Sequence, residues 1–137
     1  MPVNFDVVRT RVYEVKSAIN ELLRLTSKSY NELSLDEKYS IRYNIIMLVE
    51  ALVALCLHIA REVYSYTPKS YTDAVRLVCE KLKIPCVNDL VALVRLRNII
   101  IHRYWSIDDH KIYESVKRDF KCINELINTV EKTIGCG

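Results

Sequence analysis

The sequence predicts an all-α protein, an up-and-down bundle of four to five helices. Three observations lead to this class. The chain of 137 residues has only two glycines and three prolines, too few turn-forming residues for a many-stranded sheet. Half of its residues are hydrophobic, which is enough to form a core. These residues recur at helical spacing over long segments, and residues 1–137 are expected to form a single domain.

Two long helices are expected in the first half of the chain. The first runs from about Phe5 to Leu25, where apolar residues recur every three or four positions. The stretch "SLDE", Ser34 to Glu37, has the pattern of a capping box that starts the second helix. That helix is expected to run to roughly Tyr66, just before a proline.

The middle of the second helix, "IIMLVEALVALCLHIA", is apolar on nearly every side. This run is shorter than the roughly 20 residues that a membrane span needs, and Glu50 interrupts it. No membrane is therefore expected as a partner. Such a helix is typical of the centre of a bundle, or of a surface shared with a second subunit.

A shorter helix follows over residues 70–82, with Ser70 or Thr72 as its N-cap. Pro85 separates it from the next helix, which begins near Asn88. The rest of that helix carries the polar motif described below.

One last helix is expected from Asp108 or Asp109 to about Ile134, where Gly135 ends it.

The five cysteines form no CxxC pair, so they indicate neither a zinc site nor a redox motif. Cys56 and Cys79 lie in apolar patterns and are expected to be small core residues. A disulfide between Cys79 and Cys86 is conceivable but is not expected. His58 and Glu62 have a spacing that could hold a metal, but no further ligand completes the site. A polar contact inside the bundle is expected there, with no metal and no cofactor.

The net charge of +3 permits an anionic partner such as RNA without requiring one, because Lys and Arg are spread along the chain. The N-terminal segment carries charges throughout and has no apolar stretch typical of a signal peptide. A cytoplasmic protein is therefore expected.

The segment "RLRNIIIHRYWSID", residues 95–108, interrupts this apolar pattern with a dense set of polar side chains. In a straight helix Asn98 and His102 share a face, whereas Arg97 and His102 lie about 140° apart. Two arrangements could bring Arg97 and His102 together. The helix could end or unwind near His102, or a second copy of the chain could supply its own set across a two-fold axis.

These residue types suit RNA cleavage without a metal, in which the ribose 2′-OH attacks the adjacent phosphate. Histidine can transfer protons near neutral pH, so His102 is a candidate general acid or base. The planar guanidinium of Arg97 can stabilise charge that develops on the phosphate oxygens. One histidine does not easily serve as both acid and base, which favours a dimer with two copies of His102.

Four neighbouring residues could support this chemistry. Asn98 could orient His102 or the phosphate, and Tyr104 could stack on a base or donate its hydroxyl. Arg95 and Arg103 add positive charge for binding RNA.

Glu50 is expected to be buried, and two roles stay open for it. In a structural role it would be a paired core carboxylate that binds Arg97, while His102 caps the end of its helix. In a functional role it would support Arg97 or His102 within an active site.

The block "RNIIIHRY" reads as Arg, four residues, His, one residue, Tyr, and resembles the signature of the HEPN superfamily of helical ribonuclease and nucleotide-associated domains. The wider frame is similar to the HepT branch, whose toxins are encoded beside a minimal nucleotidyltransferase (MNT). The matching stretches are "NIIMLVEALVALCLHIA", "SYTDAVRLVCEKLKI", "LVRLRNIIIHRYWSID" and "KIYESVKRDFKCINELI". The resemblance covers roughly Val7 to Ile134.

The resemblance implies a homodimer whose active cleft lies between the protomers. It implies an endoribonuclease toxin in which Arg97 and His102 carry catalysis. It also implies that a cognate MNT antitoxin modifies Tyr104 with AMP, which would place charge and bulk beside Arg97. A larger hetero-oligomer with the antitoxin stays open. In the alternative hypothesis, the same dimer is a non-catalytic partner that holds nucleotide or substrate for a nucleotidyltransferase.

Overall fold

The computed structural model describes residues 3–118 and 120–134, and these residues form an all-helical structure, so the predicted class is confirmed. The described residues contain six α-helices and two short 3-10 turns. They are α1 (Phe5–Leu25), η1 (Tyr30–Glu32), α2 (Leu35–Glu62), α3 (Tyr71–Leu82), α4 (Val87–His102), η2 (Tyr104–Ser106), α5 (Asp109–Arg118) and α6 (Lys121–Thr133).

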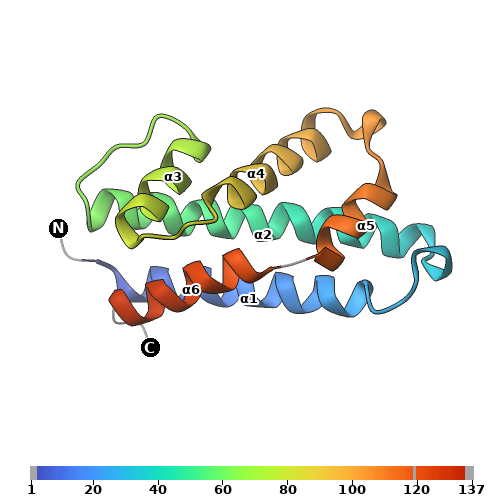
Figure 1. Cartoon of the computed structure of the whole chain (residues 1–137), viewed down its shortest axis with the longest axis horizontal. Helices are drawn as coiled ribbons and strands as arrows, with labels where there is room; N and C mark the ends of the chain where they lie inside the picture. The colour runs from blue at the N-terminus through green and yellow to red at the C-terminus, as the bar shows by residue number, and fades with distance from the viewer. Residues whose placement is uncertain (1–2, 119, 135–137) are drawn as a thin grey trace.

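Helix α2 lies along the middle of the molecule, with α1 and α6 on one side of it and α3 and α4 on the other (Figure 1). The helices share one hydrophobic core, to which α2 contributes the fully buried side chains of Leu48, Leu52 and Leu55. Buried Val8, Val15 and other residues on one stripe of α1 face this core, as the apolar spacing of that helix predicted.

The predicted capping box starts α2. The Ser34 hydroxyl accepts the backbone N–H of Glu37 at 3.1 Å, and the Glu37 carboxylate accepts the backbone N–H of Ser34 at 3.0 Å. The ammonium of Lys28 also donates to Glu37, at 2.9 Å. The hydrogen bond from Ser34, and then the one from Lys28, lower the pKa of Glu37 to about 2. These contacts satisfy N–H groups that would otherwise lack a partner at the helix start.

The end of α2 differs from the prediction, because the helix stops at Glu62 and does not continue to Tyr66. Ser65 adopts a positive φ of 51°, which turns the chain out of the helical path. The backbone N–H of Tyr66 then donates to the carbonyl of Ala60 at 2.9 Å. The sequence gives little sign of this turn, since no glycine occupies the left-handed position.

The length of α2 contradicts the argument that its apolar run is too short for a membrane. The helix has 28 residues, and its most apolar 18-residue window has a mean hydropathy of 2.0, enough for a span by length and composition alone. However, 56% of that window is buried inside the bundle. Burial of this extent is what the central helix of a bundle shows.

The prediction of one continuous last helix is wrong, because α5 ends at Arg118 and α6 begins at Lys121. Phe120 leaves the helical conformation, with φ −110° and ψ 19°, and its ring is buried. The buried residues Val116, Phe120 and Ile123 keep a spacing of three to four across the break, so their pattern reads as one helix. Gly135, the predicted end of that helix, lies outside the described residues.

A disulfide joins Cys86, the N-cap of α4, to Cys122 in the first turn of α6. The Cys79–Cys86 bond, which was conceivable but not expected, is not formed, and Cys79 is a free thiol. The pairing of Cys86 with Cys122 was not predicted. Cys56 and Cys79 are both buried, as predicted. Burial raises the pKa of both thiols, to about 11 for Cys79. Cys136 lies outside the described residues.

Candidate functional site

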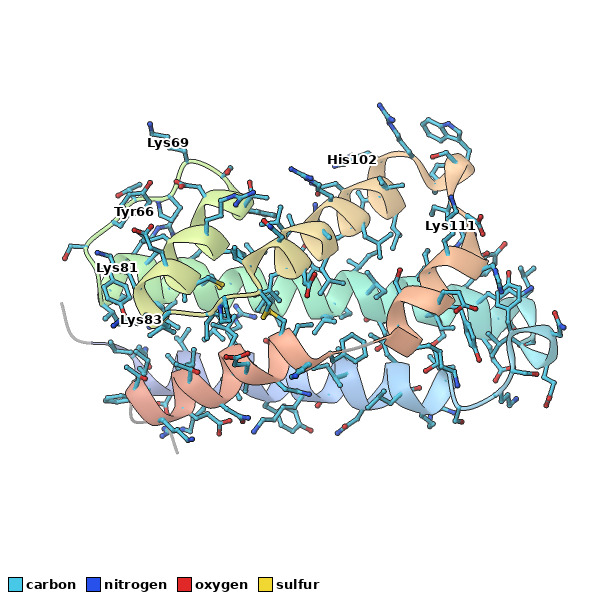
Figure 2. The ribbon with its side chains drawn as sticks, in the orientation of Figure 1. Tyr66, Lys69, Lys81, Lys83, His102 and Lys111 are labelled. Carbon is cyan, nitrogen blue, oxygen red and sulfur yellow. A yellow bond between two sulfur atoms is a disulfide. The ribbon has the colours of Figure 1, made fainter. Side chains whose placement is uncertain are left out.

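The C-terminal end of α4 projects from the bundle and carries the polar motif. Earlier in the helix Leu90, Val91 and Val94 are buried in the core. From Ile101 to Ser106, by contrast, every residue is exposed. Figure 2 shows His102 at this projecting end, away from the packed centre of the bundle. The fold therefore presents Asn98, His102 and Tyr104 to solvent, on a helix whose other end is firmly packed.

Arg97 is held from three sides by residues of three helices. Its Nη2 forms an ion pair with the carboxylate of Glu50 on α2. Its Nη1 donates to the side-chain oxygen of Asn98 at 2.9 Å. Its guanidinium carbon lies over the ring of Tyr71, the first residue of α3, at 5.6 Å from the ring centroid.

Only 16% of the Arg97 side chain is exposed, and its Nε is buried with no hydrogen-bond partner among the described residues. A guanidinium has five N–H groups. Within the described structure one bond goes to Glu50 and one to Asn98. The group is thus fixed in place, and N–H groups remain that neither of these two bonds uses.

Glu50 is less buried than predicted, with 39% of its side chain exposed. It does bind Arg97, as the sequence suggested. Met47 and Tyr43, one and two turns earlier on α2, are also exposed, so the described residues cover this face of α2 only in part. The apolar residues around Glu50 did not indicate that this face is exposed, because a helix that is hydrophobic on all sides is usually surrounded by other helices.

His102 is the last helical residue of α4, and the chain leaves the helix at Arg103, where φ is −136°. The helix stays regular from Arg97 to His102. The two side chains therefore leave the axis about 140° apart, as in an ideal helix. The helix ends only after His102, so its end does not bring His102 round to Arg97 within one chain.

Tyr104 and Trp105 are strongly exposed and stand edge to face, with ring centroids 5.3 Å apart. Both belong to η2, a single turn closed by hydrogen bonds from the backbone and hydroxyl of Ser106 to the carbonyl of Arg103, at 2.8 and 2.9 Å. Arg95 and Arg103 are exposed as well, so two further cations lie near the end of α4.

A forked ion pair fixes the far side of this loop. Arg42 of α2 donates to both carboxylate oxygens of Asp109, the first residue of α5, at 2.7 and 2.8 Å. Both side chains are mostly buried, and the contact with Asp109 raises the pKa of Arg42. Asp108 accepts the backbone N–H groups of His110 and Lys111 and so caps α5. The loop between His102 and Asp109 is consequently anchored at both ends.

The remaining candidates lie elsewhere. His58 is half-buried, and its Nε2 accepts the backbone N–H of Asn4 at 3.3 Å. The contact is polar, as expected, but it is exposed and does not lie inside the bundle. Among the described residues no group of three or more His, Cys, Asp and Glu side chains could hold a metal. An apolar cavity of about 410 Å³ between α4, α5 and α6 has neither Arg97 nor His102 in its lining.

Two contacts at the site could not be predicted from the sequence. Tyr71 reaches Arg97, and Arg42 reaches Asp109, across separate helices. Both pairs join residues far apart in the chain, so only the packing of the helices brings them together. In the sequence, nothing distinguishes Tyr71 from the other tyrosines that lie at helical spacing.

The model of the HepT-like ribonuclease family ("Ribonuclease HepT-like") matches residues 15–130. Among solved structures, the chain is similar to a toxin–antitoxin with AMP-PNP, at 19% identity and a TM-score of 0.82. It is also similar to a tri-AMPylated Shewanella oneidensis HEPN toxin in complex with MNT antitoxin, at 20% identity and a TM-score of 0.82. Each alignment covers 93% of this chain and 98% of the other.

A third similar structure is the cytosolic protein YutE from Bacillus subtilis, described as being of unknown function. It is 15% identical with a TM-score of 0.73, and the alignment covers 93% of both chains. A search of curated proteins found no match. At these identities the solved structures establish the shared helical fold. The match over residues 15–130 shows that this chain belongs to the HepT-like ribonuclease family.

Proposed function

We propose that this chain is a metal-independent endoribonuclease toxin of a HepT/MNT-type toxin–antitoxin pair, acting as a homodimer. One observation carries the proposal. Arg97 is fixed by Glu50 and Asn98 and has N–H groups that these bonds do not use, and His102 stands exposed five residues later on the same helix. Arg-x4-His-x-Tyr in this place combines a phosphate-binding cation with a group that can transfer protons.

In the proposed reaction the ribose 2′-OH loses its proton to a general base and its oxygen bonds to the adjacent phosphorus. The bond from phosphorus to the 5′ oxygen breaks, and a general acid gives that oxygen a proton. The products are a 2′,3′-cyclic phosphate and a 5′-OH. His102 transfers protons, and Arg97 stabilises the charge on the phosphorane oxygens.

A second copy of the chain supplies what one chain lacks. Arg97 and His102 point about 140° apart on a regular helix, so one ligand cannot easily touch both in a single chain. Ile99 and Ile101 are exposed beside them on α4, together with Met47 on α2. Exposed apolar side chains next to an incomplete polar site suit a two-fold interface.

The proposed partner that restrains this activity is an MNT antitoxin. The similar Shewanella oneidensis toxin is described as tri-AMPylated and in complex with an MNT antitoxin. Here Tyr104 is the candidate acceptor, because its ring stands in solvent on a loop that is anchored at both ends. An added AMP group would place a phosphate near the cations that RNA needs.

The direct test is incubation of the purified protein with RNA in EDTA. We expect cleavage without added metal and products that end in a 2′,3′-cyclic phosphate and a 5′-OH. Activity that appears only with a divalent cation, or products with other ends, would contradict the mechanism.

We expect co-expression with the cognate nucleotidyltransferase to add AMP to Tyr104. Intact-mass spectrometry should show an added mass of one or more AMP groups on the wild type and none on Tyr104→Phe, and the modified protein should no longer cut RNA. Tyr43→Phe is a matched control, since Tyr43 is similarly exposed on α2. Unchanged modification of Tyr104→Phe would overturn the assignment of the acceptor.

One observation favours a second candidate function. Arg97 is mostly buried and paired with the Glu50 carboxylate, which offsets its charge. A guanidinium in this state suits a non-catalytic partner that holds nucleotide or substrate for a nucleotidyltransferase. Nucleotide binding by the purified dimer, without any cleavage of RNA, would favour this second function.

A further inference from the structure

Tyr71 forms part of the candidate site, although neither the motif nor its position in the chain points to it. It is the first residue of α3, and 41% of it is exposed. The guanidinium carbon of Arg97 lies 5.6 Å from the centroid of its ring, within the range of a cation–π contact. The ring therefore touches the proposed phosphate-binding group while much of it still faces solvent.

The chain that leads into Tyr71 is fixed. Ser70 caps α3 by accepting the backbone N–H of Asp73 at 3.1 Å. The Asp73 carboxylate accepts the backbone N–H of Lys69 at 2.8 Å and the hydroxyl of Tyr66 at 2.9 Å. These two donors hold the pKa of the Asp73 carboxyl below its usual range, the Lys69 N–H having the larger effect. Tyr71 thus sits on a firmly held helix start.

A positive charge lies close in the chain to this ring. Lys69 is exposed two residues before Tyr71. Figure 2 shows Lys69 and His102 at the same edge of the molecule, on either side of the region where α3 approaches α4. An RNA strand that passes Lys69 along this edge would come to Tyr71, with Arg97 beside it.

We propose that Tyr71 is the platform on which an unpaired nucleobase of the RNA stacks, next to the phosphate that Arg97 holds. This inference rests on the proposed function and names a subsite of it. A single ribose joins each base to its phosphate, so a base beside the Arg97-bound phosphate lies within reach of an adjoining ring. Stacking on aromatic side chains is how proteins commonly hold unpaired RNA bases.

The subsite implies a preference for single-stranded RNA. A base inside a duplex is already stacked on its neighbours, and its faces are not open to Tyr71. Stacking is tolerant of base identity, since every base has a flat face. Tyr71 therefore selects for an unpaired nucleotide at the cut and adds little preference for one base over another.

The test measures binding of the full-length protein to single-stranded oligonucleotides. The cleaved bond is first mapped, and its nucleotide is then replaced by a 2′-deoxy nucleotide so that the RNA stays intact. We expect Tyr71→Leu to weaken binding about ten-fold and Tyr71→Phe to leave it nearly unchanged, because phenylalanine keeps the aromatic face. Tyr13→Leu is the matched control, on an exposed tyrosine of α1 remote in sequence from the site.

Removing the base from the RNA separates stacking from any effect on the position of Arg97. With an abasic nucleotide next to the cleaved bond, the wild type should bind as weakly as Tyr71→Leu binds the intact RNA. Tyr71→Leu should lose nothing further on the abasic RNA. The stacking role would be overturned if Tyr71→Leu lowered the binding affinity by the same factor on intact and on abasic RNA. It would also be overturned if Tyr71→Leu bound the intact RNA as tightly as the wild type does. In both cases the proposed ribonuclease function would stand.

Failure of the proposed function gives a different result. Wild-type protein that neither binds the single-stranded oligonucleotide nor cuts its cleavable form would overturn both proposals. Binding of the same sequence as a perfect duplex with equal affinity would overturn the subsite alone.

Discussion

Replacing His102 by alanine is expected to lower kcat for RNA cleavage by a factor of about 10²–10⁴, the usual range for loss of a general acid or base. His102 is exposed at the end of α4, so its removal should leave the fold intact. The measurement is cleavage of a labelled RNA in EDTA, with circular dichroism to check helicity. His110→Ala is the control, since His110 is an exposed histidine whose described contacts are with Tyr30 and Glu114. Equal activity of His102→Ala and the wild type would contradict the role.

Arg97→Ala should cause a loss of similar size, about 10²–10³, through the lost stabilisation of phosphate charge. Its effect on stability should be small, because the Glu50 carboxylate that it leaves behind is 39% exposed and can be solvated by water. Arg97→Lys should stay impaired, since an ammonium lacks the planar fork that binds Glu50, Asn98 and a phosphate together. Arg76→Ala, at an exposed arginine of α3, is the matched control.

Mixed dimers test the geometry of α4 directly. If Arg97 of one protomer works with His102 of the other, and each site uses one His102, a dimer of one Arg97→Ala chain and one His102→Ala chain keeps one complete site and loses the second. Mixing the two inactive variants should then restore substantial activity. If both groups acted within one chain, neither site in the mixed dimer would be complete, and mixing would restore nothing. Because the Arg97 and His102 side chains leave a regular helix about 140° apart, we expect mixing to restore RNA cleavage.

The sequence was informative wherever the relevant interaction is local. The capping box at Ser34 and Glu37 involves residues three apart, and the spacing of apolar residues in α1 reflects a single face of one helix. The position of the motif at the end of α4 is local too. These features could be predicted because short segments of the chain determine them.

Interactions between distant segments were harder to predict, and they explain the main errors. The break at Phe120 leaves the apolar spacing of α5 and α6 unchanged, so periodicity could not reveal it. Glu50 was expected to be buried because the residues around it are apolar, yet the described residues cover its face of α2 only in part. The pairing of Glu50 with Arg97 was suggested only because a lone carboxylate in an apolar helix needs a partner.

The pairing of the cysteines also depends on segments that are distant in the chain, so it could not be predicted from the sequence. Five cysteines without a recognisable spacing allow several pairings, and the choice depends on which helix ends meet. In the structure the start of α4 meets the start of α6, which places Cys86 beside Cys122. The bond lies next to Phe120, where the last predicted helix divides. It thus connects the helix that carries Arg97 and His102 to the segment whose course the sequence did not reveal.

Removing this bond is expected to lower the melting temperature by about 10–15 °C. The two cysteines are 36 residues apart, and closing a loop of that length restricts the unfolded chain by about 4 kcal/mol in the chain-entropy description. For a chain of this size each kcal/mol corresponds to roughly 3–4 °C. Thermal unfolding of the wild type with and without a reductant measures the difference.

The double variant Cys86→Ala/Cys122→Ala should melt at the temperature of the reduced wild type, and reductant should have no further effect on it. Alanine is the suitable replacement, because Cys122 is buried and a serine there would add a buried hydroxyl. Cys56→Ala is a poor control for the same comparison, since that thiol fills a fully buried core position and its loss would leave a cavity. A melting temperature unaffected by reductant in the wild type would mean that the two sulfurs are not bonded in the folded protein, and that contacts among the apolar side chains alone hold α4 against α6.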